Sequence, residues 1–551
     1  MKDLILKHTL INAVEHEGKA DLQSVIGKII AEDPKYKEKI KELISQIKKT
    51  VEEVNSWNQE KRSKELKKFG KIEKEEVKEE GLHELANAKF GKVVMRLAPY
   101  PSGPLHIGNA RMVILNDEYS KRYHGKLYLV FDDTIGSEEK PIIPEGYDLI
   151  LESLKWLGVK HENPIYKSDR LQIFYDYAKE LIEMGDAYVC FCKADVLRKN
   201  RVEGISCEHR NQSVHDNLKL WKNMIDGKYQ EGQAVVRLKT DMKHPNFAFR
   251  DRVLLRVVRR RHPRVGTKYH VWPLLEFSWA IDDHLLGVTH ILRGKDLLME
   301  DMMEEHIWKN FMWDKPEFIH YGLISLDEMK LSKTESRKNI EKGVYQGWDD
   351  PRTWSMQSLK RRGIKPEAVR RFVLKMGLSQ ADVSVPAEIL YAENRKLIDS
   401  EANRYFAVLN PVEIKIEKSP KIKEAKAPVH PDFPKKGKRK LQVGERIFIE
   451  KDDLEKLDGK EVRLMDLYNV KLGKNSKFID KELRMELPKI QWVSEPNVEI
   501  KIVMPDGTVK TGMAEKNVKD LNKDELIQLM RIGFCRVDSV GKETVLYFAH
   551  K

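Results

Sequence analysis

The sequence has few cysteines and no long apolar run, and these two absences exclude several classes of protein. Only 4 of its 551 residues are cysteine, too few for a secreted fold held together by disulfides. No apolar stretch approaches the ~18 residues that a membrane-spanning helix needs. The first residues carry charges on both sides of a short apolar stretch and show no small-residue cleavage site. We therefore expect no signal peptide, no membrane partner and a cytoplasmic location.

Charge is abundant and of both signs. The chain has 100 Lys and Arg against 87 Asp and Glu, a formal net charge of +13, and 41% of its residues are hydrophobic. This balance permits a large core and excludes a wholly disordered chain. Because a single core rarely exceeds about 250–300 residues, we expect about two to four domains. The basic excess favours a polyanionic partner without identifying it.

The composition and the hydrophobic pattern of the sequence change twice along the chain. Residues 1–90 are rich in Lys, Glu, Leu and Ile at helical spacing, which predicts a helical appendage. From Lys92 a strand, a Pro/Gly loop, a helix and a second strand follow one another, which predicts a parallel α/β sheet. A mixed segment at 188–272 interrupts this alternation. Residues 405–551 contain short alternating strands that predict one or two β-barrels, and the Lys/Pro-rich stretch at 420–440 is expected to be a loop.

The loop after the first predicted strand reads APYPSGPLHIGN. Loops at the carboxyl ends of parallel strands bind ligands, and the N-terminus of the following helix attracts phosphate. Gly103 and Gly108 allow a ligand to approach the backbone, and His106 and Asn109 can donate hydrogen bonds to phosphate oxygens. Taken alone, this segment is better explained as an ordinary strand–helix turn capped by a histidine.

A second loop, DEMKLSKTES, follows a late strand-like segment. Lys330 and Lys333 are point charges suited to a triphosphate, and Ser332 and Thr334 add hydroxyl donors. Alone, this stretch would be read as a solvated turn.

The two loops together resemble the signature motifs of the class I aminoacyl-tRNA synthetases. HIGN is similar to their His-Ile-Gly-His motif, and KLSKT to their Lys-Met-Ser-Lys-Ser motif. RLAPYPSGPLHIGN, VFDDT, DDHLLGVTHILRGKDLL, MKLSK and FCRVD occur in the order found in the archaeal glutamyl-tRNA synthetases of the glutamyl/glutaminyl branch. The resemblance covers about 90–551. The sequence departs from the family pattern at Asn109, where many relatives have His, and at Leu331 and Thr334 in the second motif. It also departs at Leu275, in WPLLEFSWAIDD, where the glutaminyl and bacterial glutamyl enzymes usually have Tyr.

The resemblance implies a multidomain protein built around an α/β Rossmann-like catalytic domain. It divides the chain into a helical N-terminal appendage (1–90), the catalytic domain (91–187 and 273–330), an inserted subdomain that binds the acceptor end of tRNA (188–272), the second motif loop with a helical connecting domain (331–404), and C-terminal all-β anticodon-binding barrels (405–551).

The resemblance also assigns the residues around ATP. His106, Asn109, Lys330 and Lys333 are the implied catalytic residues. The implied ATP-binding set adds the loop residues Pro101, Gly103, Gly108 and Ser332. ATP is expected to act with Mg²⁺, for which the sequence offers no protein ligand that can be named.

Arg96, Asp132 and Arg293 resemble the amino-acid-binding residues of the family. A glutamate pocket needs a guanidinium for the side-chain carboxylate and an acidic group for the ammonium. Arg293 is informative, because glutaminyl enzymes usually carry an uncharged Cys there, and a buried Arg would be unpaired beside an amide. The alternative is that Arg293 forms a structural ion pair with Asp282, Asp283 or Asp296.

Three of the four cysteines lie within CFCKADVLRKNRVEGISCEH. Cys190, Cys192, Cys207 and His209 form a C-x-C and a C-x-H pair across a loop, the spacing of a tetrahedral Zn²⁺ site with no open position. The zinc would be structural, as in the zinc knuckle of some glutamyl-tRNA synthetases. The alternative is chance clustering of buried cysteines. Cys535 is left over and is expected to be buried.

Basic runs near the end of the insertion and after the second motif predict contacts with a tRNA backbone. The candidate residues are Arg259, Arg260, Arg261, Lys360, Arg361 and Arg362. Each run alone would be read as a solvated face.

The resemblance implies attachment of L-glutamate to tRNA in two steps, through a glutamyl-adenylate. Its expected partners are ATP, L-glutamate and tRNA(Glu), and also tRNA(Gln) if the archaeal habit of charging both holds; a monomer is expected. The rivals are a glutaminyl-tRNA synthetase of the same fold, a nucleotidyltransferase of the superfamily, and a non-catalytic tRNA-binding paralogue. The barrel residues that would read the anticodon cannot be named from the sequence.

Overall fold

A computed structural model describes residues 2–15, 19–22, 24–26, 29, 36–69, 82–327 and 332–551. The chain divides into two compact units, Met1–Glu80 and Gly81–Lys551. No helix within the described residues is long and apolar enough to cross a membrane.

The N-terminal unit is helical, as the sequence predicts. Its helices are α1 (Lys2–Glu15), α3 (Tyr36–Ser56) and α4 (Gln59–Lys67). On α3, Ile47, Val51 and Val54 recur at helical spacing and are buried, which gives the unit a small core of its own.

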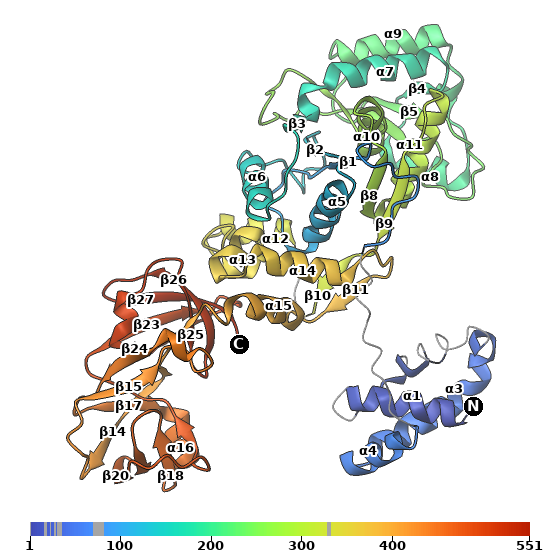
Figure 1. Cartoon of the computed structure of the whole chain (residues 1–551). Coiled ribbons are helices and arrows are strands. Elements are labelled where there is room, and N and C mark those ends of the chain that lie inside the picture. Colours follow the sequence, from blue (N-terminus) through green and yellow to red (C-terminus); the bar gives the residue numbers. More distant parts are fainter. Residues whose placement is uncertain are drawn as a thin grey trace. The chain divides into compact units, whose positions relative to one another are not determined.

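The second unit is built on parallel strands that alternate with helices. The strands β1 (Val94–Leu97), β2 (Lys126–Phe131) and β3 (Ile165–Tyr166) pair in the order β1-β2-β3, and β8 (His290–Gly294) pairs with β9 (Glu317–Tyr321). A backbone hydrogen bond from Thr289 to Val94 (2.9 Å) connects β8 to β1. All carboxyl ends therefore meet at one edge, where ligands of such sheets bind (Figure 1).

Helices cover these strands and complete their core. The first crossovers run through α5 (Ala110–Arg122) and α6 (Gly146–Trp156), and later helices add to the same packing. The remaining helices and short strands of this part are α7 (Leu171–Glu183), α10 (Leu275–Leu285), α11 (Leu298–Asn310), β10 (Ile324–Leu326), α12 (Lys333–Glu341), α13 (Met356–Arg362), α14 (Pro366–Met376), β11 (Val383–Val385) and α15 (Glu388–Ile398).

The segment that interrupts the alternation is an antiparallel sheet with two helices. Its elements are β4 (Ala187–Cys190), α8 (Ala194–Glu203), α9 (Val214–Ile225), β5 (Val235–Leu238), β6 (Val253–Val257) and β7 (Val271–Pro273). The buried side chains of α9 and of most strand residues share one core with α7, α10 and α11, whereas Leu197 of α8 packs with Cys190 and Cys207. The insertion is therefore fused to the sheet by packing, in addition to its two chain connections.

The C-terminal part contains two seven-stranded sheets, which confirms the expected barrels. One has the order β12-β25-β26-β27-β23-β24-β13 and the other β21-β18-β19-β20-β14-β17-β22. The elements are β12 (Asn403–Tyr405), β13 (Ala407–Leu409), β14 (Pro411–Glu417), β15 (Glu424–Pro428), β16 (Lys438–Gln442), β17 (Ile447–Glu450), α16 (Lys451–Leu457), β18 (Glu461–Leu464), β19 (Asn469–Lys471), β20 (Asn475–Asp480), β21 (Lys489–Ile490), β22 (Val493–Ser494), β23 (Asn497–Val503), β24 (Val509–Glu515), β25 (Leu526–Leu529), β26 (Gly533–Ser539) and β27 (Thr544–His550).

The Lys/Pro-rich stretch expected to be a loop contains the hairpin β15–β16. Its exposed lysines alternate with Ala425, Ala427 and Leu441, which are buried. The period of two was hidden because the apolar residues are mostly alanines.

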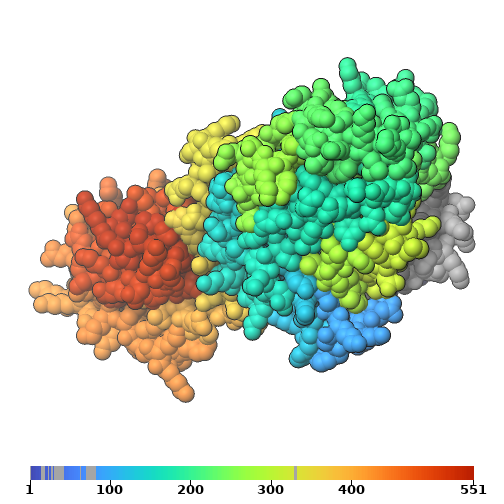
Figure 2. Space-filling model, turned by 90° about the horizontal axis from the view of Figure 1, so that it is seen from above, coloured from blue at the N-terminus to red at the C-terminus, as the bar shows by residue number. Residues whose placement is uncertain are grey.

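The helix α13 connects the sheet domain to the barrels. Arg362 at its end is fully buried and donates to the carbonyl oxygens of Phe548 (3.3 Å) and Ala549 (2.8 Å) on β27. Arg361 forms an ion pair with Asp538 (3.1 Å) on β26. Figure 2 shows the barrels (orange to red) joined to the rest of this unit through this part of the chain (yellow).

Candidate active site

The HIGN segment forms one 3₁₀ turn, Ile107–Asn109, directly before α5. Nδ1 of His106 accepts a hydrogen bond from the Gly108 amide (3.1 Å), and the Asn109 side chain accepts one from the His106 amide (3.2 Å). Because Nδ1 accepts, we assign the imidazole proton to Nε2, which is then a neutral donor. Asn109 likewise keeps its side-chain NH₂ as a donor.

Residues from much later in the chain, at 348–356, contact the loop that carries HIGN. The Ile107 amide donates to the Trp354 carbonyl (3.1 Å), and the Met356 amide donates to the Leu105 carbonyl (2.9 Å). Gly103 has φ +144°, and a Cβ atom there would lie 2.9 Å from the Trp348 ring. A side chain at position 103 would therefore be strained and would displace Trp348. Pro101 contributes its carbonyl oxygen, which accepts from the Ile143 amide (3.0 Å).

The second motif reaches the first at the start of α12. Ser332 is the N-cap of this helix and accepts from the Glu335 amide (3.2 Å). Lys333 and His106 line one small hollow of about 10 Å³, together with Trp348. Such a volume holds about one water molecule, so a triphosphate would have to displace Trp348 or α12. Lys330 lies outside the residues that the structure describes.

Burial sets the protonation of both residues. Burial, with a smaller contribution from the charge of Lys333, lowers the pKa of His106 to about 3. Burial also lowers the pKa of Lys333 to about 8. At pH 7 His106 is thus neutral and Lys333 is mostly charged, and within the described residues no carboxylate forms an ion pair with this lysine.

Ion pairs dominate the opposite end of the site. Arg96 on β1 is buried and donates to both carboxylate oxygens of Asp283 (2.8 and 2.9 Å). Burial opposes the charge of Arg96, but Asp283 holds its pKa above the ordinary value. Asp132 directly follows β2 and is also buried. Arg96 and Asp132 thus both lie near the carboxyl edge of the sheet.

Arg293 on β8 is buried and paired with two carboxylates. It donates through Nε to Asp301 (2.7 Å) and through an Nη atom to Glu304 (2.8 Å), both on α11. These differ from the partners considered from the sequence, since Asp283 pairs with Arg96 and Asp282 pairs with Arg170 (2.7 Å). Burial raises the pKa of Glu304 to about 8 against the opposing effect of Arg293.

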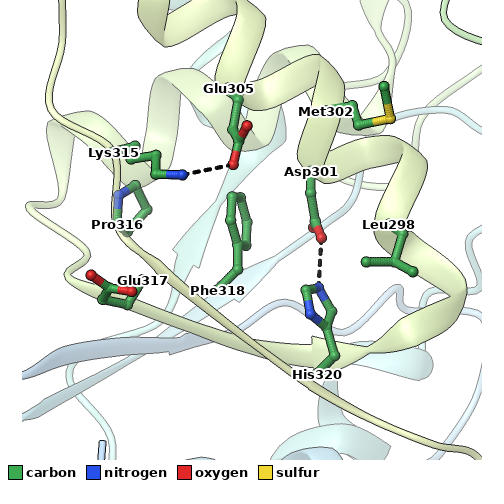
Figure 3. A pocket seen from close by; sticks show the side chains of 9 residues that line it. All are labelled: Leu298, Asp301, Met302, Glu305, Lys315, Pro316, Glu317, Phe318 and His320. Carbon is green, nitrogen blue, oxygen red and sulfur yellow. Dashed lines mark hydrogen bonds and ion pairs between the residues drawn. The ribbon is translucent and has the colours of Figure 1, made fainter. Parts of the chain in front are cut away.

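A hollow of about 350 Å³ lies between α11 and β9, and Asp301 is among the residues that line it (Figure 3). His320 points from β9 toward Asp301, and the two form a 2.5 Å hydrogen bond. Asp301 therefore receives donors from both His320 and Arg293, which fixes the direction of the guanidinium.

Lys167 and Trp279 were missed by sequence reasoning. Lys167 follows the two-residue strand β3, is 0% exposed, and lies 3.2 Å from Asp132. The cationic groups of Arg96, Lys167 and Arg293 lie 5.0, 5.2 and 5.2 Å from the centre of the Trp279 ring. The repeated strand–helix order, which makes PIYKSD a third strand end, was the signal that could have revealed Lys167.

The four predicted metal ligands lie together at the edge of the insertion. Their ligand atoms are all within 4.8 Å of one another. Cys190 Sγ lies 3.8 Å from Cys207 Sγ, and His209 Nδ1 lies 3.8 Å from Cys190 Sγ and 3.5 Å from Cys192 Sγ. A tetrahedral Zn²⁺ with Zn–S bonds of ~2.3 Å has S···S edges of ~3.8 Å. The donor set therefore fits zinc in both chemistry and spacing.

The predicted tRNA-binding residues differ in exposure. Arg259 and Arg261 are exposed, and Arg259 donates to the carbonyl oxygens of Gly227 and Tyr229 (both 2.7 Å). Arg260 is half-buried and donates to the Gly136 carbonyl (2.6 Å), directly beside the active site. Exposed Lys360 lies beside Glu152 (4.0 Å), whereas Arg361 and Arg362 are engaged with the barrel as described above.

Comparison with known proteins defines the class to which this architecture belongs. Residues 92–400 match the catalytic domain of the class I tRNA synthetases (E and Q), and 402–487 and 489–538 match two anti-codon binding domains of the same family. The chain belongs to this family of class I synthetases.

Within that family, the chain is similar over its whole length to archaeal glutamate–tRNA ligases. It is 44% identical to the enzyme of Pyrococcus furiosus over 576 residues and 42% identical to that of Methanocaldococcus jannaschii over 563 residues, with 100% of each chain covered. Among solved structures, a glutamate tRNA ligase from Elizabethkingia meningosepticum has a TM-score of 0.41 and 21% identity, over 57% of this chain and 70% of that chain.

Proposed function

We propose that this chain joins L-glutamate to tRNA(Glu) in two ATP-dependent steps. The α-carboxylate of glutamate attacks the α-phosphate of ATP, which releases pyrophosphate and leaves glutamyl-adenylate. The terminal ribose hydroxyl of the tRNA then attacks the adenylate carbonyl and displaces AMP. The observation that carries the proposal is the convergence of His106 and Lys333 on one hollow, in a chain similar over its whole length to glutamate–tRNA ligases.

The ATP end supplies hydrogen-bond donors and positive charge. Neutral His106 would donate from Nε2 and Asn109 from its side-chain amide, while Lys333 stabilises the negative charge that develops on the phosphates. Lys330, Ser332 and the loop residues Pro101, Gly103 and Gly108 complete the proposed ATP-binding set. Class I synthetases use ATP with Mg²⁺, and the ion would add charge neutralisation between the phosphates.

The amino-acid end provides for recognition of glutamate. Asp132 would accept a hydrogen bond from the substrate ammonium, while Arg293 would face the side-chain carboxylate and Arg96 would complete the glutamate-binding set. Arg293 is held by Asp301 and Glu304, so its guanidinium is positioned before substrate binds. An amide in place of the substrate carboxylate would carry no charge to attract this guanidinium, and its NH₂ group would set a donor against the guanidinium donors, which favours glutamate over glutamine.

We further propose that Cys190, Cys192, Cys207 and His209 hold a structural Zn²⁺. The ion would tie the end of β4 to the 207–209 turn and so order the insertion that receives the acceptor end of tRNA. The exposed cations Arg259, Arg261 and Lys360, with half-buried Arg260, are the proposed contacts to the tRNA backbone. Arg361 and Arg362 would instead hold α13 against the barrel.

The deciding experiment is charging of purified tRNA(Glu) and tRNA(Gln), separately, with labelled glutamate or glutamine in the presence of ATP. Glutamate on tRNA(Glu) alone is the result expected of a discriminating enzyme. Glutamate on both tRNAs would extend the proposal to an enzyme whose product on tRNA(Gln) must be amidated by a second enzyme. Charging with glutamine, or tRNA binding without any charging, would overturn it.

A further inference from the structure

Lys167 is a buried cation at the amino-acid end of the active site. The two-step reaction proposed above assigns it no role. It stands at the carboxyl end of β3, next to the end of β2 where Asp132 lies. The side chain is 0% exposed. A lysine is almost never buried unless its charge is paired or used.

The contacts of Lys167 leave part of its donor capacity unused. Nζ donates to Ser278 Oγ (2.7 Å) and lies 3.2 Å from Oδ1 of Asp132. An ammonium group has three N–H donors, and within the described residues this one makes a hydrogen bond only to Ser278, so two donors have no hydrogen-bond partner. Within the described residues, no side chain donates a hydrogen bond to Asp132, and its Oδ1 is buried without such a partner.

The pairing of Lys167 is looser than that of its neighbours. Arg96 donates two hydrogen bonds to Asp283, and Arg293 donates to Asp301 and Glu304. By contrast, the Lys167–Asp132 pair is held by proximity, without a well-aligned hydrogen bond. Of the three cations around Trp279, Lys167 can change partner at the lowest cost.

We propose that Lys167 binds the α-carboxylate of the glutamate substrate during adenylate formation. An α-amino acid carries an ammonium and a carboxylate on one carbon, so it can insert between Asp132 and Lys167. The substrate ammonium then pairs with Asp132 and its α-carboxylate with Lys167, which replaces one loose ion pair by two. This inference rests on the function proposed above.

The same contact assists the reaction. An oxygen of the α-carboxylate forms a bond to the α-phosphorus of ATP, and the bond to pyrophosphate breaks, with the electron pair leaving on pyrophosphate. Both reactants are anions. The charge of Lys167 reduces their repulsion as they approach, and its hydrogen bond orients the attacking carboxylate.

The test compares glutamate with L-glutamol, which keeps the ammonium and the γ-carboxylate but has a hydroxyl in place of the α-carboxylate. ATP–pyrophosphate exchange, with tRNA(Glu) present, gives the KM of glutamate and the inhibition constant of glutamol for the full-length wild type and for Lys167→Met. We expect the variant to raise the KM of glutamate ~10- to 100-fold, the effect of losing a hydrogen bond to a charged group. The inhibition constant of glutamol should change less than about 3-fold, because glutamol never makes this contact.

Equal weakening of glutamate and glutamol would overturn the proposal, since it would mean that Lys167 is structural or faces the γ-carboxylate. An unchanged KM for glutamate would overturn it as well. If Lys167→Met does not fold, Lys167→Gln keeps a donor for Ser278 but removes the charge, and the ratio of the two constants decides in the same way. Lys179→Met, at an exposed lysine of α7, is the matched control. Absence of glutamate-dependent exchange in the wild type would instead refute the proposed function and is distinguishable from these outcomes.

Discussion

The two ends of the active site handle charge in opposite ways. At the ATP end a neutral histidine and a lysine line a hollow of only about 10 Å³, and within the described residues that lysine has no carboxylate partner. At the amino-acid end Arg96, Lys167 and Arg293 each lie against a carboxylate of the protein. The ATP end is thus ready for a polyanion once it opens, whereas the amino-acid end must exchange ion pairs with its substrate.

The difference follows from the ligands. A triphosphate carries several negative charges and brings Mg²⁺ with it, so one unpaired cation and neutral donors suffice for recognition. Glutamate carries one positive and two negative groups, so its site needs charges of both signs at fixed positions. Pre-formed ion pairs hold those charges in place and keep them stable while the site is empty.

Loss of the unpaired cation at the ATP end should have the largest effect. Lys333→Ala should slow adenylate formation by ~100- to 1,000-fold, the usual cost of removing one group that stabilises transition-state charge. Rapid-mixing kinetics measure the activation step, and a filter-binding assay should show little change in tRNA affinity. Lys338→Ala, at an exposed lysine of the same helix, is the control. An unchanged rate of adenylate formation would contradict the role of Lys333 as the cation that stabilises the phosphates at the ATP end.

At the amino-acid end, Arg293→Gln should raise the KM of glutamate by ~10- to 100-fold, because the substrate carboxylate loses a charged donor. The preference for glutamate over glutamine should fall with it, and the KM of ATP should stay nearly constant. His320→Gln, which replaces the imidazole donor beside Asp301 by an amide donor, should change the KM of glutamate by less than about 3-fold. A larger effect from His320→Gln than from Arg293→Gln would contradict the proposal that Arg293 contacts the substrate directly and His320 acts only through Asp301.

Loss of zinc should separate the two reaction steps. The proposed metal lies in the insertion, away from both ends compared above, so Cys192→Ser should retain ATP–pyrophosphate exchange. Its charging of tRNA should fall by about 10-fold, because the insertion that receives the acceptor end loses the order that the metal provides. Elemental analysis should find one Zn²⁺ per wild-type chain and less in the variant. Metal-free wild-type protein with full charging activity would refute the zinc site.

A change of pH should alter a different kinetic constant at each end: kcat/KM for ATP at the ATP end and the KM of glutamate at the amino-acid end. Both effects should be only a few-fold. Raising the pH through about 8 removes the charge of Lys333, so kcat/KM for ATP should fall. The same rise ionises Glu304 beside Arg293, which places a second negative charge near the substrate carboxylate, so the KM of glutamate should increase. Glu304→Gln should flatten the second profile and leave the first unchanged. If the KM of glutamate depended on pH in the same way in the wild type and in Glu304→Gln, ionisation of Glu304 would not be the cause.

Features with local causes were predictable from the sequence alone. The parallel α/β sheet, the helical N-terminus and the barrels follow from hydrophobic periodicity and turn residues, and the strand–loop–helix order locates HIGN at a strand end. Cys190, Cys192, Cys207 and His209 could be grouped because they lie within 20 residues of one another. The hairpin β15–β16 was missed because alanines and prolines obscured its alternation.

Only the tertiary structure decided which charges meet. Arg293 pairs with Asp301 and Glu304, although Asp282, Asp283 and Asp296 are just as near in sequence. Lys167 reaches Asp132 because β2 and β3 are neighbours in the sheet, and a strand of two residues is too short to leave a periodic signal. The reason is physical: periodicity and local spacing record how each element forms, whereas the partner of a buried charge depends on the packing of elements far apart in the chain.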